Sequence, residues 1–416
     1  MFQSLLNAWK LPDLRKKLLF TALIIAIYRL GCYIPSPGVS VSAMKQMFGS
    51  GGVFDFYDLF TGGGLQKVAI FAMGIMPYIT ASIIMQLLTM VSPRLEALMK
   101  EGPAGQKKVN QYTRYFTAIL ALVEAVGFVF LFKNYGAFPA DKPLTPTRFI
   151  LVVLTLTVGA VMVMWLGEMI TQRGIGNGIS LMIFASIVSR LPSGLQKLFN
   201  MNPAYWVAMA IISLLVVAAV IFVTQGQRRI PVQYAKRVVG RKVYGGQSTY
   251  LPLKVNMAGV IPVIFASSVL LFPVTLAQMA PWGWAKSLGK AIGPSTWWYL
   301  AAEVILIIVF TYFYTAVQFN PIDQADNLKK YGGFVPGIRP GRPTAAYLDR
   351  VLTRITLPGA LFLAAVVLLP TALYKGINVQ FYFGGTSLLI VVGVALDTMQ
   401  QMESQLLMRH YEGFLK

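Results

Sequence analysis

Long apolar runs without a charge are the feature that most constrains how this 416-residue sequence can fold. About 20 apolar residues in an α-helix cross the hydrocarbon layer of a membrane. Six apolar runs carry no charged residue, and they are 68–93, 149–167, 198–227, 255–285, 355–374 and 376–396. Four further apolar segments are short or contain one charge, and they are 18–34, 115–132, 174–189 and 297–319. The sequence therefore predicts ten transmembrane helices.

The composition supports a membrane protein and excludes most other classes. Charged residues make up 12% of the chain, whereas soluble globular proteins carry about 25%. The mean hydropathy of +0.63 excludes a soluble enzyme, a disordered chain and a coiled coil. No segment alternates polar and apolar residues with the period of a membrane β-barrel strand. We therefore expect an all-α polytopic membrane protein.

Few side chains could support catalysis or bind a metal. The chain has one cysteine, Cys32, and one histidine, His410, which excludes an internal disulfide, a thiolate cage and a histidine metal cluster. The run GIGNG at 174–178 imitates a phosphate-binding loop, but it lacks the preceding strand and the lysine of such loops. We read it as a tight turn at the start of the fifth span. No enzyme activity, cofactor or metal is expected.

The distribution of lysine and arginine predicts the orientation, because cytoplasmic loops are enriched in them. The odd-numbered hydrophilic segments hold 25 of these residues and the even-numbered ones hold 10. Both termini are therefore predicted in the cytoplasm. Tyr33, Ile34 and Pro35 stand where a signal peptide would have small residues, so we interpret the first span as a retained anchor.

The span count also predicts the domain organisation. Five spans precede residues 200–203 and five follow, so the second set begins outside and runs with opposite topology. Such an arrangement is typical of inverted repeats around a central path. We expect an N-terminal half at 1–200 and a C-terminal half at 201–416.

Two long cytoplasmic loops, 225–254 and 320–354, are more basic than orientation requires. The first contains seven positive and no negative charges, and its β-favouring runs 230–234 and 243–250 predict a hairpin. In the second, Arg339 lies in a stiff segment of prolines and glycines at 335–343. Attraction to anionic lipids is the simpler interpretation. The alternative is a docking surface for a partner rich in phosphate.

The outer loop ends in an unusual aromatic run. Phe54, Phe56, Tyr57, Leu59 and Phe60 precede three glycines, Gly62, Gly63 and Gly64, which run directly into the second span. An exposed loop does not normally carry so many large apolar side chains. We expect them to be buried in a protein cavity or at the membrane interface, with the glycines as a hinge.

Several long strings, in the same order, resemble the bacterial SecY family, the central subunit of the Sec protein-conducting channel. They include AMGIMPYITASII at 72–84, RGIGNGIS at 173–180 and LPLKVNMAG at 251–259. Further matching runs lie at 101–105, 111–115, 165–168, 226–229, 325–330, 336–341 and 381–387. The GGG run at 62–64 matches the family's SGG only loosely.

The resemblance implies a channel for unfolded secretory polypeptides in the bacterial cytoplasmic membrane. The family fold is a clamshell of two inverted five-helix halves around an hourglass pore, with a re-entrant plug half-helix at about 54–67. The implied partners are the small membrane subunits SecE and SecG, the SecA motor, the ribosome, and signal sequences. The family releases apolar segments sideways into lipid through a lateral gate.

The resemblance also implies roles for individual residues, each of which has a simpler structural interpretation. The pore ring corresponds to Ile75, Ile79, Ile183, Ile264 and Ile390, although isoleucines in spans usually face lipid or the core. The lateral gate corresponds to Pro77, Thr80, Ile83, Pro262, Ser267 and Ser268, with the prolines, Pro273 included, expected to kink their helices. The plug comprises the aromatic run and its glycines, which could instead form an interfacial turn. Ribosome and motor docking corresponds to Arg228, Arg229, Arg241, Lys242 and Arg339.

Charges inside the spans raise an alternative function, an ion-coupled secondary transporter. Glu124 and Glu303 lie in the third and eighth spans, and Arg29 lies in the first, from which we expect it to extend outward. A proton relay needs a chain of such groups. The spans contain no histidine, lysine or paired acid, which argues against the transporter. A membrane scaffold without a pore has little support.

Overall fold

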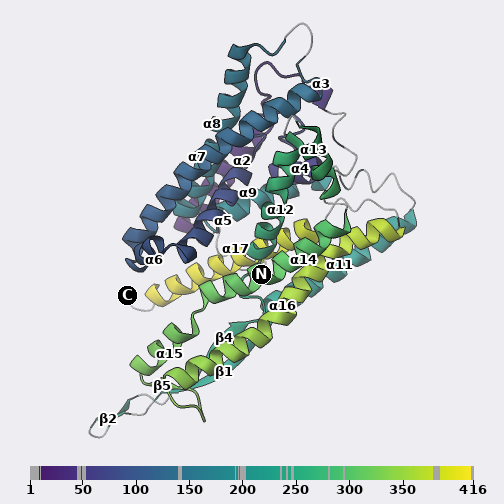
Figure 1. Ribbon diagram of the computed structural model, residues 1–416. Coiled ribbons are helices and arrows are strands. Elements are labelled where there is room, and N and C mark those ends of the chain that lie inside the picture. The colour runs from purple at the N-terminus through teal and green to yellow at the C-terminus, as the bar shows by residue number, and fades with distance from the viewer. Residues whose placement is uncertain are drawn as a thin grey trace. The chain divides into compact units, whose positions relative to one another are not determined.

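A computed structural model of the chain is mostly helical (Figure 1). The structure describes residues 9, 11–44, 48, 53–138, 143–192, 194, 196, 203–234, 237–239, 242–244, 248–279, 282–293, 296–377 and 385–413. By contacts these residues form two compact units. The first unit comprises Met1–Pro203, Ser267–Leu300 and Val394–Lys416, and the second comprises Ala204–Ala266 and Ala301–Gly393. The predicted halves 1–200 and 201–416 stay a prediction.

Among the described residues, six helices are long and apolar enough to cross a membrane. They are α7 (Pro103–Asn134), α8 (Pro146–Arg173), α11 (Pro203–Gln225), α12 (Ile261–Met279), α14 (Trp297–Gln318) and α16 (Arg342–Ile377). A seventh span results if α5 (Met76–Val91) and α6 (Pro93–Lys100) are counted together, although they bend by 97° at Ser92. The structure thus confirms a multi-span helical membrane protein, and the count of ten stays a prediction.

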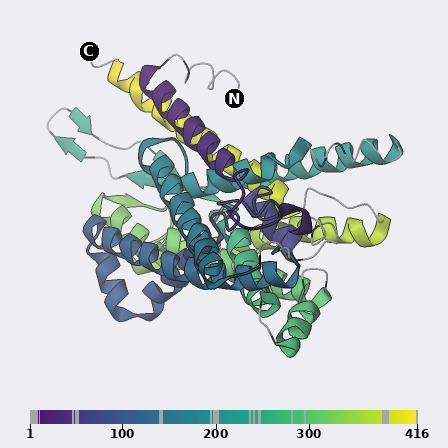
Figure 2. The same cartoon turned by 90° about the horizontal axis from the view of Figure 1, so that it is seen from above.

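Three other helices coincide with the remaining apolar segments. They are α2 (Pro12–Gly31), the short α9 (Gly178–Val188) and α17 (Gly385–Gly413). In the first unit α2 lies along the C-terminal part of α17 (Figure 2). Leu14 of α2 and Met402 of α17 pack with Ile175, and Lys17 donates a hydrogen bond to the Gln405 side chain at 3.2 Å. These contacts join α2 to the C-terminal part of α17 within this unit.

Helices α8 and α9 approach each other closely because glycines face each other at their contact. Asn177 begins α9, and its side-chain oxygen accepts hydrogen bonds from the amides of Ile179 and Ser180 at 3.1 and 3.3 Å. A Cβ on Gly178 would collide with the carbonyl of Gly167 on α8. The prediction that 174–178 forms a turn and a helix start, rather than a phosphate loop, is confirmed.

The second unit carries the predicted hairpin. Strand β1 (Gln227–Tyr234) pairs antiparallel with β4 (Ser248–Lys254), and β2 (Arg237–Val239) pairs with β3 (Lys242–Tyr244) beyond them. The second basic loop adds a strand that we did not predict, β5 (Gly333–Phe334), which pairs with the end of β1. Helix α15 (Pro321–Lys330) precedes it. The two basic loops therefore form one structure.

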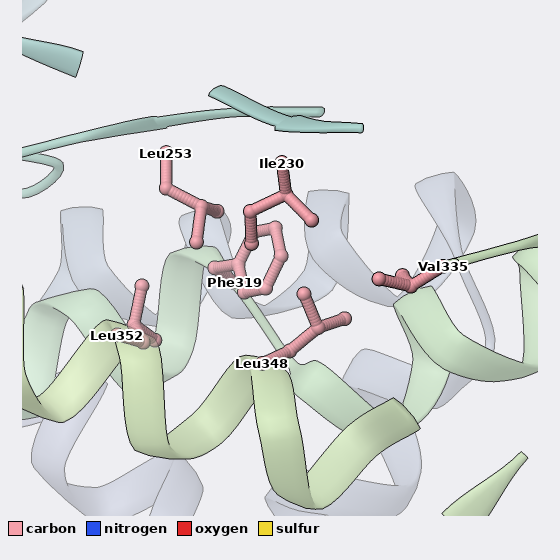
Figure 3. Close-up of a cluster of buried hydrophobic side chains, with 6 residues drawn as sticks. All are labelled: Ile230, Leu253, Phe319, Val335, Leu348 and Leu352. Carbon is pink, nitrogen blue, oxygen red and sulfur yellow. The ribbon is translucent and has the colours of Figure 1, made fainter. Parts of the chain in front are cut away.

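A hydrophobic cluster attaches the hairpin to the start of α16 (Figure 3). Along β1 the side chains alternate, so that Ile230 and Val232 are buried while Arg229 is exposed. The cluster consists of Ile230, Leu253, Phe319, Val335, Leu348 and Leu352. The hairpin is thus fixed to a long helix rather than suspended on a flexible loop.

Several predicted helix starts and kinks are wrong. The second span was expected from residue 68, but residues 62–75 form turns, and α5 begins only at Met76. Pro77 is therefore in the first turn of α5, and Pro262 is in the first turn of α12, where a missing backbone N–H breaks no helical hydrogen bond. Of the three prolines only Pro273 lies inside its helix. Neither Pro77 nor Pro262 kinks its span.

Candidate functional site

A short helix, α4 (Val53–Thr61), connects the first and second spans. It ends at two glycines in the left-handed region, Gly62 with φ +64° and Gly63 with φ +89°, which other residues rarely adopt. The chain then continues in turns as far as α5. The glycine run therefore lies where a hinge was predicted, and it reverses the chain after α4.

The aromatic side chains of α4 that the structure describes are buried in protein, one of the two expected environments. Phe54, Tyr57 and Phe60 are 6%, 3% and 1% exposed, and Leu59 is half-buried. The Tyr57 ring packs edge-on against Phe128 of α7 with 5.4 Å between ring centroids. The side chain of Phe56 lies outside the described part of the structure. In this unit α4 is thus enclosed by protein rather than laid on a surface.

A buried glutamate from the third predicted span reaches α4. Glu124 of α7 accepts a hydrogen bond from the Tyr57 hydroxyl at 3.3 Å, and the same hydroxyl lies 3.3 Å from the carbonyl oxygen of Met73. Glu124 was one of the two acids that raised the transporter alternative. In the structure its hydrogen-bond partner is Tyr57 of α4.

Arg29 also contacts α4, and the extension of its side chain toward the outer membrane surface stays a prediction. Its Nη1 donates to the carbonyl oxygen of Gly62 at 2.9 Å. The C-terminal end of a helix carries partial negative charge and unpaired carbonyl groups, so a cation is stabilised there. Cys32 lies beside it and donates to the carbonyl of Thr61 with 3.6 Å between sulfur and oxygen. The end of α4 is therefore held by side chains from the end of the first span.

Asp58 of α4 is a fully buried charge, and we did not single it out from the sequence. Its Oδ1 accepts hydrogen bonds from the Thr61 hydroxyl at 3.0 Å and from the amides of Leu65 and Gln66 at 2.9 and 3.1 Å. Its Oδ2 forms an ion pair with Arg190, which follows α9. An acid inside an aromatic run was the available signal, because a buried carboxylate needs a compensating partner.

The predicted pore isoleucines are all buried, three in the first unit and two in the second. Ile75 immediately precedes α5, and its Cδ1 lies 3.4 Å from the position of a Cβ on Gly167. The Ile79 amide donates to the Ile75 carbonyl at 3.1 Å, so these residues are one helical turn apart. Ile183 lies on α9, Ile264 on α12 and Ile390 on α17. Their convergence on a ring stays a prediction.

The predicted gate residues lie in the first half of α5 and in the first half of α12. Pro77, Thr80 and Ile83 are buried on α5, and the Thr80 hydroxyl donates to the Met76 carbonyl of its own helix at 3.1 Å. The predicted gate residues on α12, which are also buried, are Pro262, Ser267 and Ser268. The gate itself stays a prediction.

The predicted docking residues are exposed wherever the structure describes them. Arg228 and Arg229 lie on β1, where their cross-strand neighbours are Leu253 and Pro252. The backbone of Arg339 is fixed, since its carbonyl accepts a hydrogen bond from the Thr344 hydroxyl at 2.8 Å, while its side chain is exposed. Arg241 lies outside the described residues. The backbone of Lys242 lies in β3, and its side chain is not among those described.

Comparison with solved structures shows a shared fold. The structure of a protein conducting channel matches with a TM-score of 0.66 and 22% identity, over 94% of this chain and 92% of the other. A SecY protein whose plug domain is described as stabilising the closed channel and its membrane seal matches with a TM-score of 0.64 at 22% identity, over 94% and 92%. Sec61 in the canine ribosome–channel complex from the endoplasmic reticulum matches with a TM-score of 0.62 at 21% identity, over 96% of each chain.

Sequence comparison shows the family. The SecY family model matches residues 69–399. Protein translocase subunit SecY of Streptomyces griseus is 51% identical over 439 aligned residues, and that of Streptomyces scabiei is 50% identical over 440, in both cases across the full length of both chains. A family model over most of the sequence and full-length relatives at half identity show that this chain belongs to the SecY family.

Proposed function

We propose that this chain is the channel-forming subunit that passes unfolded secretory polypeptides across the membrane and releases apolar segments sideways into lipid. One observation carries the proposal beyond family membership. The short helix α4, between the first two spans, is buried in the first unit and is held by side chains from α2, α7 and the end of α9. An element of this kind is suited to close a path and to be displaced.

In this proposal α4 is the plug half-helix. A segment that does not span the membrane is tolerated at membrane depth when protein surrounds it. The burial of Phe54, Tyr57 and Phe60 agrees with that condition. The plug domain of the solved SecY protein, described as stabilising its closed channel, lends support by fold similarity.

We further propose ten spans in two inverted halves in the bacterial cytoplasmic membrane, with both termini in the cytoplasm. The excess of lysine and arginine in the odd-numbered segments supports this orientation. The tryptophans support the position of span ends, although not the orientation. Four of the seven tryptophans, Trp282, Trp284, Trp297 and Trp298, lie between α12 and the start of α14 and are exposed. Exposed tryptophans at span ends are typical of the membrane–water interface.

The transporter alternative has no support from the family, whose curated relatives are named translocase subunits. The hydrogen bond between Tyr57 and Glu124 gives that acid a role in holding α4. The family is one of channels rather than enzymes, so the energy for transport is expected from a partner. We propose SecE and SecG as membrane partners, with the SecA motor and the ribosome on the cytoplasmic side.

The proposed function is tested by reconstitution. Liposomes that contain the purified full-length chain with its membrane partners are expected to take up an unfolded secretory polypeptide, measured by protease protection, when the motor and ATP are supplied. Uptake should require a signal sequence, and the same liposomes should not accumulate small solutes along an ion gradient. Gradient-driven solute uptake without polypeptide uptake would identify a transporter instead.

The exposed hairpin should bind the ribosome through phosphate. We expect Arg228→Glu with Arg229→Glu to weaken ribosome binding about tenfold or more at low salt and to flatten its salt dependence, because two phosphate contacts are lost. Arg339→Glu is the matched control in the second loop, since we propose that Arg339 serves the motor. It should impair motor-driven uptake more than ribosome affinity. An unchanged affinity and salt slope in the hairpin variant would exclude β1 as the docking site.

A further inference from the structure

One ion pair in the first unit joins α4 to the end of α9. Asp58 is fully buried, whereas the Arg190 side chain is 28% exposed. Gly62, which follows α4, lies against the same helix, since a Cβ there would be 3.0 Å from the Cα of Ser186. The contact between α4 and α9 is thus tight backbone packing that ends in a charge pair.

Loss of the ion pair has different consequences for the two charged side chains. Arg190 is partly exposed and can turn its guanidinium to water. Asp58 cannot reach water while α4 stays in place, and an uncompensated buried carboxylate is strongly destabilising. An intact pair is close to neutral, because the attraction and the loss of hydration largely offset each other. The pair therefore permits α4 to stay without making it costly to displace.

Besides pairing with Arg190, Asp58 stabilises the turn after α4, and the two roles can be tested separately. Its Oδ1 holds the turn after α4 through Thr61, Leu65 and Gln66, and Oδ2 pairs with Arg190. Asparagine keeps an oxygen for the turn and removes the charge. The charge on residue 58 can thus be tested without removing the acceptor that shapes the turn.

We propose that Asp58 and Arg190 are positioning residues that form a charge latch, in which the paired charges allow α4 to stay seated in the idle channel and to leave when the path opens. The inference rests on the proposed function, because it assigns the regulation of the same site. In the seated state the charges compensate each other. In the displaced state both charges are solvated in a water-filled path. Removal of Arg190 alone penalises only the seated state.

The latch predicts a specific order among variants. Arg190→Gln should raise the frequency of idle openings about tenfold or more, because Asp58 is left buried and unpaired. Asp58→Asn should raise it only about threefold, since Arg190 can reach water. The double variant Asp58→Asn/Arg190→Gln, with no charge to compensate, should open less often than Arg190→Gln alone. Arg190→Lys keeps the charge and should stay close to the wild type.

The experiment records ion conductance of the full-length channel complex in planar bilayers without substrate. Arg148→Gln is the matched control, since Arg148 lies in the first turn of α8, next to another predicted outer segment, and its Nη1 donates to the carbonyl of Pro143 at 3.3 Å. It should leave idle openings unchanged. Thermal unfolding in detergent shows which variants are folded. If Arg190→Gln does not fold, recovery of folding in the double variant supports the coupling.

Two results would overturn the latch. One is an Arg190→Gln channel that opens as rarely as the wild type. The other is a double variant that opens as often as Arg190→Gln or more often, since the effects of uncoupled charges add in free energy and would make the double variant open more often than either single variant. Polypeptide uptake by wild-type liposomes separates this failure from failure of the proposed function. If wild-type liposomes take up polypeptide but the variants show no coupling, only the latch is excluded. If wild-type liposomes take up no polypeptide, the channel assignment itself is excluded.

Discussion

A short crosslink between cysteines at positions 83 and 268 is expected to abolish secretion, whereas a long flexible crosslink at the same positions should permit it. Ile83 lies on α5 and Ser268 on α12, the two helices that the family resemblance names as the lateral gate. Apolar segments of a substrate must reach lipid without crossing water, so the channel wall must part between two helices. A short covalent link prevents that separation.

The reason why these helices should part easily differs from the one that the sequence suggested. Pro77 and Pro262 lie in the first turns of their helices and do not weaken them. Of the features that the sequence suggested, there remain Pro273 inside α12 and the small hydroxyl side chains, which are Thr80, Ser267 and Ser268. Hydrogen bonds between such groups contribute about 0.6–2 kcal/mol each in membranes. An incoming apolar helix can replace contacts of that strength.

The crosslinking experiment starts from Cys32→Ser, because Cys32 is the one cysteine of the sequence. Cysteines in place of Phe130 on α7 and Phe149 on α8 form the matched control, since these rings already pack at 5.8 Å within the first unit. A short crosslink there should leave secretion unchanged. Secretion that continues through a fully formed short crosslink at 83 and 268 would exclude the gate.

Substitution of asparagine for the pore isoleucines should make the idle channel leak ions. An apolar constriction excludes ions because it dewets when empty, and stiff β-branched side chains keep it narrow. Asparagine at Ile75 or Ile183 brings hydrogen-bonding groups that hold water. We expect an increase in idle conductance of at least about tenfold for either variant, measured in planar bilayers.

The control for this prediction is a substitution of the same kind on an exposed helix face. Val158 on α8 is 54% exposed, and Val158→Asn should not raise conductance. Buried asparagine without a partner destabilises a protein, so thermal unfolding must show that the Ile75 and Ile183 variants are folded. A folded Ile75→Asn channel with wild-type conductance would exclude Ile75 as a residue of the pore ring.

The sequence predicts local elements well where short-range chemistry decides them. Apolar runs located the six described helices that are long enough to cross a membrane, because the length of hydrocarbon to be crossed is fixed. Asn177 followed by Gly178 located the start of α9, since asparagine satisfies the first free amides of a helix. β-favouring runs around the turn located the hairpin of β1 and β4.

Features decided by distant contacts could not be predicted in the same way. Strand β5 is two residues long and pairs only because the cluster around Phe319 and Leu348 brings its loop to β1. The late start of α5 follows from turns that lie against other helices, as where a Cβ on Gly159 of α8 would meet the Ile70 carbonyl. The partner of Asp58, Arg190, is far away in the sequence. These are tertiary effects that no local pattern encodes.

The central claim is that this chain encloses a sealed path that an unfolded polypeptide can occupy. The most direct test is the conductance of Ile75→Asn channels before and after a secretory polypeptide is arrested in transit. We predict that the variant leaks when idle, that the arrested polypeptide blocks the leak, and that release of the polypeptide restores it. A leak that the arrested polypeptide leaves unchanged would contradict the account, because the ions and the polypeptide would then follow different paths.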